Sequence, residues 1–146
     1  MKKNAKKIIL IIIIAVIAVV TVMGYLMWNK PHKNVKDTAG VKITAAELYN
    51  SFITDSAKAR ALYTGKVVEV SGEIIKMALN QQQQQIIFLK TAAEGAYINC
   101  TMEEKAEGHK IGDILMIKGI CSGYMSGDAD MGLPGDVIIV RGYHAD

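Results

Sequence analysis

Hydrophobic and polar residues alternate along the stretch Gly65–Ile74, GKVVEVSGEI. Its apolar positions Val68, Val70 and Ile74 are separated by Glu and Ser side chains. A period of two is typical of a β-strand with one buried and one solvent-exposed face. Gly72 interrupts the pattern, as expected where a strand of a small barrel bulges or approaches another backbone closely. We therefore expect this stretch to be the first strand of a curled sheet.

Further short apolar runs predict four more strands: Gln85–Lys90, Ala96–Met102, Ile114–Gly123 and Asp136–Arg141. The segments between them predict a hairpin loop with five consecutive Gln over Lys76–Gln85, a short polar helix or turn over Met102–Lys110, and a Gly- and Asp-rich loop over Tyr124–Gly135. Five short strands in this order match an OB-fold barrel. The strand ending in Gly119–Gly123 is the expected pairing partner of the first strand.

A short helical segment is expected to precede the strands. Thr44 and Glu47 have the spacing of a capping box, in which the Thr side chain caps backbone amides and the Glu side chain reaches back. The predicted helix runs to about residue 55, with Leu48, Phe52 and Ile53 on its packing face. A second helical turn is expected over residues 57–63. The predicted fold class is therefore mainly β, with this helical segment in front of the barrel.

An uncharged run of 21 residues, Ile8–Trp28, lies near the N-terminus and follows four Lys residues. About 20 apolar residues cross a bilayer core as a helix, and Tyr25 and Trp28 at the far end suit the headgroup region. A cleaved signal peptide is the alternative, but its apolar part would be shorter. The expected organisation is a cytoplasmic basic tail (1–7), a transmembrane signal anchor (8–28), a tether (29–42) and an OB-fold domain (43–146). The anchor is expected to cross a bacterial inner membrane once, leaving this domain on the extracytoplasmic (periplasmic) side.

Charge is distributed unevenly along the chain. Residues 1–42 hold eight Lys and one Asp, whereas residues 43–146 hold nine Lys and Arg against thirteen Asp and Glu. The basic character of the chain therefore belongs to its N-terminal segment, and the predicted domain is acidic. A domain that binds nucleic acid through its phosphates is expected to be basic. The charge thus argues against nucleic acid as a partner.

Several stretches together resemble a bacterial family of membrane-attached OB-fold proteins. They are the basic N-terminus with its single hydrophobic helix, NKPHK in the tether, ITAAELYNSF, YTGKVVEVSGEI and IGDILMIKGICSGY. The family is described as tRNA-anticodon-binding-domain-like, and its members are often labelled lipoproteins. The resemblance implies an OB-fold and attachment to the cell envelope, and it implies no catalytic residue. This chain has no lipid-accepting Cys after its hydrophobic run.

Cys100 and Cys121 are the only cysteines, and both fall in the apolar phase of their predicted strands. Outside the cytoplasm such a pair can be oxidised, which would close a loop of about 20 residues and stabilise the fold by about 3 kcal/mol. Two reduced core thiols are the alternative. No metal site is expected, because His32, His109 and His144 fall in the tether, a turn and the tail.

A binding surface is expected on the outward phase of the second and third strands, where OB-folds usually bind ligands. The candidate residues are Lys76, Lys90, Tyr97, Asn99 and Thr101. A Tyr beside amide and hydroxyl groups suits a sugar or a peptide. An ordinary solvent-exposed strand face is the alternative interpretation of the same residues.

The sequence therefore favours a membrane-anchored, extracytoplasmic binding module for an oligosaccharide, a peptide or an envelope protein. No cofactor is expected, and no cluster of titratable groups or nucleophile motif indicates an enzyme. Two alternatives stay open. One is a structural subunit of an envelope complex, in which the apolar helix makes the contacts. The other is a module that binds single-stranded nucleic acid.

Overall fold

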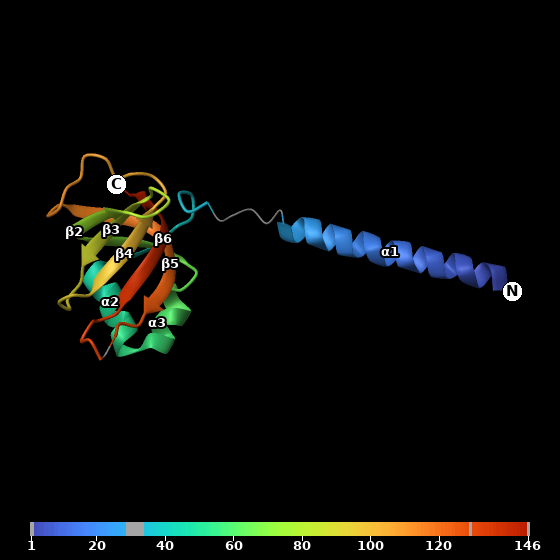
Figure 1. Ribbon diagram of the computed structural model, residues 1–146, viewed down its shortest axis with the longest axis horizontal. Coiled ribbons are helices and arrows are strands. Elements are labelled where there is room, and N and C mark those ends of the chain that lie inside the picture. The colour runs from blue at the N-terminus through green and yellow to red at the C-terminus, as the bar shows by residue number, and fades with distance from the viewer. Residues whose placement is uncertain (1, 29–33, 129, 146) are drawn as a thin grey trace. The chain divides into compact units, whose positions relative to one another are not determined.

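The computed structural model describes residues 2–28, 34–128 and 130–145, and the chain divides into two compact units, Met1–Asn34 and Val35–Asp146. The first unit contains the helix α1 (Lys2–Trp28), which Figure 1 labels. Its side chains from residue 12 to 25 are exposed. The other side chains of the predicted span, at 8–11 and 26–28, lie outside the described residues, as do residues 29–33 of the predicted tether. Within the described part of the chain, no helix combines the length and the apolar character needed to cross a membrane.

Two short helices lie near the start of the second unit. The helix α2 (Ala45–Thr54) starts at the predicted capping box: the Glu47 backbone N–H donates to Thr44 Oγ1 at 3.2 Å, and the Thr44 N–H donates to Glu47 Oε2 at 3.1 Å. The helix α3 (Ser56–Tyr63) follows directly and is capped by Asp55, whose side chain accepts from the Lys58 N–H at 3.0 Å. Both predicted helical segments are confirmed, but Ile53, which was expected on the packing face of α2, is 52% exposed.

Loss of this cap should destabilise the domain measurably. Thr44→Ala is expected to lower the free energy of unfolding by about 1 kcal/mol, measured by urea unfolding at pH 7, whereas Thr54→Ala at the exposed end of α2 should change it little. The hydrogen bond from Thr44 lowers the pKa of Glu47. The cap therefore stabilises the fold at neutral pH and loses this contribution as the pH falls through the folded-state pKa of Glu47. An equal effect of both substitutions would contradict this role.

Five strands close into a barrel: β2 (Val67–Leu79), β3 (Gln85–Lys90), β4 (Tyr97–Met102), β5 (Ile114–Met125) and β6 (Asp136–His144). Their order is β2-β3-β4-β6-β5, and β5 pairs back with β2 (Figure 1). The parallel pair is β4 with β6, and the other neighbours around the barrel are antiparallel. This is the five-stranded OB-fold barrel that the sequence predicts.

The extent of some elements differs from the prediction. β2 continues to Leu79, so the hairpin loop shrinks to residues 80–84, and β6 continues to His144 instead of ending at Arg141. Residues 103–113, for which the sequence left a helix or a turn open, form turns. The expected partner of the first strand is confirmed, because Val68 of β2 lies opposite Gly119 of β5.

One strand, β1 (Val41–Thr44), is not predicted by the hydrophobic pattern. It pairs in parallel with β2, with Val41 opposite Val68 and Thr44 opposite Ser71. Residues 41 and 42, assigned to the tether from the sequence, therefore belong to the sheet. Val35 is also buried, with 2% of its surface exposed, and the second unit begins at this residue. The compact unit thus starts eight residues before the predicted boundary at 43.

The core fills the barrel and the space beneath α2. Val68, Val70 and Ile74 of β2 are fully buried, which confirms the predicted alternation, and Leu48 and Phe52 of α2 belong to the same cluster. Figure 1 shows α2 and α3 together at one end of the barrel.

Gly72 permits α2 to approach the sheet closely. A Cβ atom at Gly72 would lie 2.9 Å from the Cβ of Ala45 and 3.1 Å from the Cβ of Leu89. Close approach is therefore the reason for this glycine. The irregularity in the pairing of β2 with β3 lies instead between Ile74 and Lys76.

Candidate functional site

The predicted binding residues lie on the outer surface of the barrel, on β2, β3 and β4. Register places Lys76 opposite Phe88 and Phe88 opposite Asn99, so these side chains form a row across the three strands. Lys90 lies opposite Tyr97 in the next row. We call this surface the β3–β4 face. Thr101 extends it on β4, opposite Ile86.

Two aromatic rings touch on this face. The ring centroids of Phe88 and Tyr97 are 5.9 Å apart with an interplanar angle of 84°, an edge-to-face arrangement. The Lys76 ammonium lies 5.2 Å from the centre of the Phe88 ring, a cation–π distance. Both rings are half-buried and thus keep part of their surface in solvent. They provide an apolar platform of defined shape.

The outward orientation of Phe88 was not predicted, because QIIFLK contains four consecutive apolar residues and such a run does not show which side chains face outward. Ile87 and Leu89 are both fully buried. The residue between two inward-facing positions of a strand must point outward. Phe88 therefore lies on the outer surface next to Tyr97, so the face has two aromatic residues instead of the single Tyr that was expected.

Polar groups on this face are available to a ligand. The side chains of Asn99 and Thr101 are half-buried, and neither forms a hydrogen bond to another residue that the structure describes. The hairpin loop after β2 adds exposed amides. Its backbone is held by Asn80, whose Oδ1 accepts from the N–H groups of Gln82 and Gln84, each at 2.9 Å. Amide and hydroxyl groups can both donate and accept hydrogen bonds.

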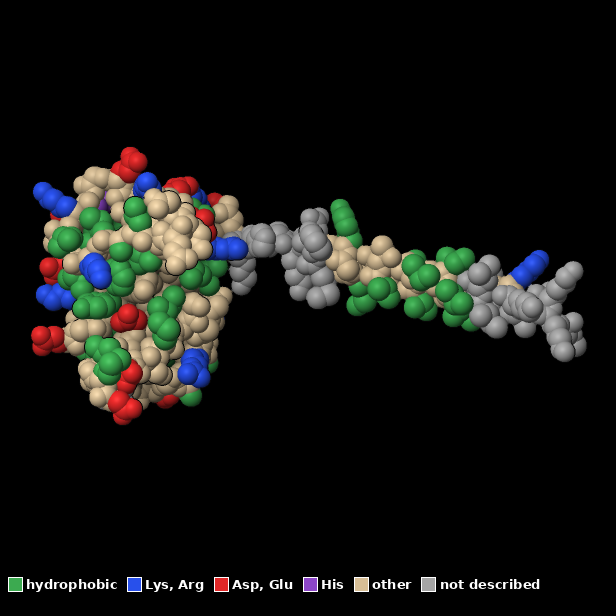
Figure 2. All heavy atoms as spheres, in the orientation of Figure 1, with side chains coloured by type: hydrophobic (Ala, Val, Ile, Leu, Met, Phe, Trp, Pro, Cys, Tyr) green, Lys and Arg blue, Asp and Glu red, His purple; other side chains and the backbone are tan. Residues whose placement is uncertain are grey.

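Charges on the β3–β4 face largely balance. Lys90 Nζ lies 3.3 Å from a carboxylate oxygen of Glu73, and the Tyr97 N–H donates to Asp136 Oδ1 at 2.9 Å. Partial burial raises the pKa of Asp136, and the hydrogen bond from Tyr97 opposes this shift. Figure 2 shows hydrophobic side chains spread over the visible side of the barrel among isolated charged groups. The face therefore lacks the concentrated positive charge that phosphate backbones require.

Comparison with known proteins assigns the chain to a family. The tRNA_anti-like family model matches residues 1–131, and the barrel has the strand order of an OB-fold. The chain belongs to the tRNA_anti-like family. A search of curated proteins found no match. The match covers the N-terminal helix and the barrel as far as the loop before β6. It therefore includes the first unit of this tRNA_anti-like protein and most of the second.

The two cysteines of the tRNA_anti-like barrel are present as free, buried thiols. Cys100 of β4 and Cys121 of β5 both lie opposite Ile139 of β6, on its two sides. Two strand spacings in a curled sheet place their Cα atoms about 8–10 Å apart, whereas a disulfide needs less than about 7 Å. The register therefore favours the reduced alternative over the disulfide.

Burial should make both thiols unreactive in the folded protein. Desolvation raises the pKa of Cys121 to about 11 and raises the pKa of Cys100 further. At pH 8 we expect iodoacetamide to modify neither thiol in the native protein and to modify both in 6 M guanidinium, as counted by mass spectrometry. Failure to label the denatured protein until a reductant is added would reveal a disulfide and contradict the register argument.

Other clusters give weaker candidates in the tRNA_anti-like domain. His109 and His144 have ring centroids 4.8 Å apart, although the sequence places them in a turn and the tail. Among the described residues, no group of three or more His, Cys, Asp or Glu side chains is arranged to hold a metal ion. A groove between α2 and α3 has Leu62 and Tyr63 in its lining and Glu47 and Asp55 among its polar residues.

Proposed function

We propose that this chain is a membrane-anchored binding module that holds an oligosaccharide or a peptide on the β3–β4 face and does not catalyse a reaction. The observation that carries the proposal is the Phe88–Tyr97 ring pair next to Asn99 and Thr101, whose side chains have no hydrogen-bond partner among the described residues. Aromatic rings supply apolar contact area at low conformational cost, and nearby amides and hydroxyls orient a polar ligand. An envelope protein that presents such a segment would use the same contacts.

The charge of the second unit supports this ligand class over nucleic acid. Residues 35–146 hold eleven Lys and Arg against fourteen Asp and Glu, and Lys90 on the face is already paired with Glu73. Single-stranded nucleic-acid sites combine stacking rings with a basic groove along the backbone. The β3–β4 face offers the rings without the groove.

Binding can be tested with three kinds of probe on the full chain in detergent micelles. Oligomers of four to six N-acetylated hexosamines, unstructured ten-residue peptides and a 12-nucleotide oligo(dT) should be titrated by calorimetry at low and high salt. We expect binding of a sugar or peptide probe that changes little with salt. Binding confined to oligo(dT), weakening steeply with salt, would contradict the proposal.

Support for membrane anchoring comes from the uncharged run Ile8–Trp28 with four Lys residues before it. We further propose that the anchor lies in the bacterial inner membrane and that the barrel is extracytoplasmic. In spheroplasts, added protease should then digest the barrel, while carbonate at pH 11 should leave the chain in the membrane fraction. A protected barrel would contradict the orientation, and release by carbonate would contradict the anchor.

The structural-subunit alternative makes a different prediction about the same run. Replacing Ile8–Trp28 by a polyleucine span of equal length preserves anchoring but removes helix-specific contacts. Under our proposal, ligand binding and membrane attachment are unchanged by this replacement. Loss of a stable complex only in the polyleucine variant would favour the structural role.

A further inference from the structure

A second surface of the barrel gathers lysines from segments that are far apart in the sequence. A groove of about 720 Å³ has Lys36, Lys42, Lys105 and Lys118 in its lining, with Glu69 and Glu104 between them. We call it the basic groove. It has two more Lys than Glu residues, whereas the second unit as a whole has more acidic than basic residues. Positive charge is therefore concentrated at this place on an acidic domain.

The unbalanced charge resides on exposed side chains. Lys36 Nζ lies 2.6 Å from Glu104 Oε1, and Lys118 Nζ lies 3.6 Å from Glu69 Oε1. Lys42 is 4.0 Å from the same Glu69, and 78% of its side chain is exposed. Lys105 is exposed and forms no ion pair with another residue that the structure describes. Lys42 and Lys105 are thus exposed to an anionic partner.

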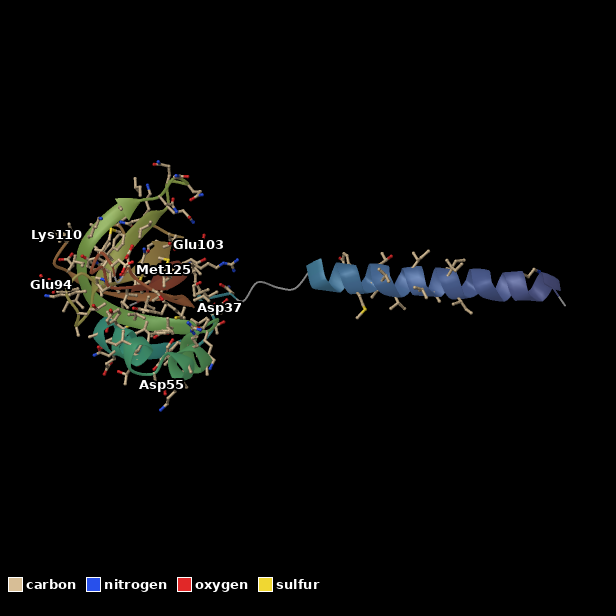
Figure 3. The ribbon with its side chains drawn as sticks, turned by 60° about the horizontal axis from the view of Figure 1, so that its bottom comes forward. Asp37, Asp55, Glu94, Glu103, Lys110 and Met125 are labelled. Carbon is tan, nitrogen blue, oxygen red and sulfur yellow. The ribbon has the colours of Figure 1, made fainter. Side chains whose placement is uncertain are left out.

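The chain enters the second unit at this groove. Val35 is buried, the backbone oxygen of Lys36 accepts a hydrogen bond from Lys118 Nζ at 3.0 Å, and Lys36 Nζ lies 4.7 Å from the centre of the Tyr143 ring. Figure 3 shows Asp37 and Glu103, the sequence neighbours of Lys36 and Glu104, on the same side of the barrel. These contacts fix the position of the entry point relative to the groove.

Covalent connection limits how far the groove can lie from the end of α1. Residues 29–34 separate Trp28 from Val35. A fully extended chain of this length spans on the order of 25 Å. If the N-terminal helix is embedded in a bilayer, the basic groove therefore stays within about this distance of the lipid headgroups. The short connection keeps the groove at a high effective concentration near the lipid headgroups. A weak attraction between the groove and the headgroups is then sufficient to orient the barrel.

We propose that the basic groove docks on the anionic phospholipid headgroups of the membrane that holds the N-terminal helix. The inference rests on the anchoring proposed above. Lysines near an anionic surface are attracted to it, and the acidic remainder of the barrel is repelled. The groove is therefore the side that turns toward the lipid, and its lysines interact with headgroup phosphates.

Amine labelling of the full chain in nanodiscs tests the docking. N-hydroxysuccinimide acetate should modify Lys42 and Lys105 roughly threefold more slowly in phosphatidylcholine–phosphatidylglycerol (7:3) than in phosphatidylcholine alone. Lys58 and Lys110, which are exposed outside the groove, should react equally in both lipids. At 0.5 M NaCl the difference should disappear. Equal lipid dependence at all four lysines would overturn the inference.

Two matched variants separate the groove from net charge. Docking should also slow the labelling of Lys36, which lines the same groove. In Lys42→Gln/Lys105→Gln this slower labelling of Lys36 in anionic nanodiscs should be lost, because the two exposed positive charges are removed. In Lys58→Gln/Lys110→Gln, which changes the net charge equally, the slower labelling of Lys36 should remain. The same result in both variants would show that only the overall charge matters and would contradict docking through the groove.

Size-exclusion chromatography distinguishes failure of the anchor from failure of docking. Elution of the chain without lipid would refute the anchoring proposal, and the docking inference with it. Co-elution with nanodiscs without lipid-dependent protection of Lys42 and Lys105 would refute the docking alone. Ligand binding on the β3–β4 face is a separate measurement in either case.

Discussion

Phe52→Ala is expected to lower the free energy of unfolding by about 3–5 kcal/mol, measured by urea unfolding of the full chain. The Phe52 ring is 1% exposed and stacks on Tyr124 at 6.2 Å, with Tyr63 at 6.3 Å on another side. Removing it leaves a cavity between α2 and the end of the barrel. This loss is a large part of the total stability of a small domain.

The neighbouring residue provides the control for this prediction. Ile53 lies on the same helix but is 52% exposed. Ile53→Ala should therefore change the unfolding free energy by less than about 0.5 kcal/mol. If Phe52→Ala and Ile53→Ala lowered the unfolding free energy equally, the side of α2 that carries Phe52 would not be the side that packs against the barrel.

Tyr97→Ala is expected to weaken ligand binding by roughly 30-fold, the effect of about 2 kcal/mol lost at an aromatic anchor. Phe88→Ala should act in the same direction. The two rings are in contact, so their effects should not add, and a double-mutant cycle should show coupling of about 0.5–1.5 kcal/mol. Titration calorimetry with the sugar or peptide probe that binds most tightly measures the affinities of Tyr97→Ala, Phe88→Ala and the double variant.

Met116→Ala is the matched control for the binding measurements. Met116 is half-buried on β5, where it lies opposite Ser71 of β2, away from the β3–β4 face. Its truncation removes apolar surface from the outside of the barrel without altering the ring pair. Equal loss of affinity in Met116→Ala and Tyr97→Ala would place the ligand elsewhere or show a general loss of folding.

The sequence predicted those elements whose signal is local. β3 was predicted to the residue, because the short apolar run IIFL is bounded by Gln85 and Lys90. The capping box likewise depends on residues within one turn of helix. The end of β6 was missed because Arg141 has a positive φ of 53° and breaks the alternation, so that Gly142 faces inward after Ile139.

Features that depend on residues distant in sequence could not be predicted in this way. β1 is four residues long and is defined by its parallel partner on β2. The relation of Cys100 to Cys121 passes through Ile139 of a third strand. The basic groove combines Lys36 and Lys118, which meet only in the folded chain. The outward orientation of Phe88 likewise follows only from the burial of Ile87 and Leu89 in the fold.

The most direct test of the proposed binding face is a map of amide chemical shifts of the ¹⁵N-labelled full chain in detergent micelles, recorded with and without the sugar or peptide probe that binds most tightly. We expect the largest shifts on residues 86–90 of β3 and 97–101 of β4, with smaller shifts in the hairpin loop 80–84. Shifts centred on the groove between α2 and α3, with β3 and β4 unchanged, would contradict this expectation.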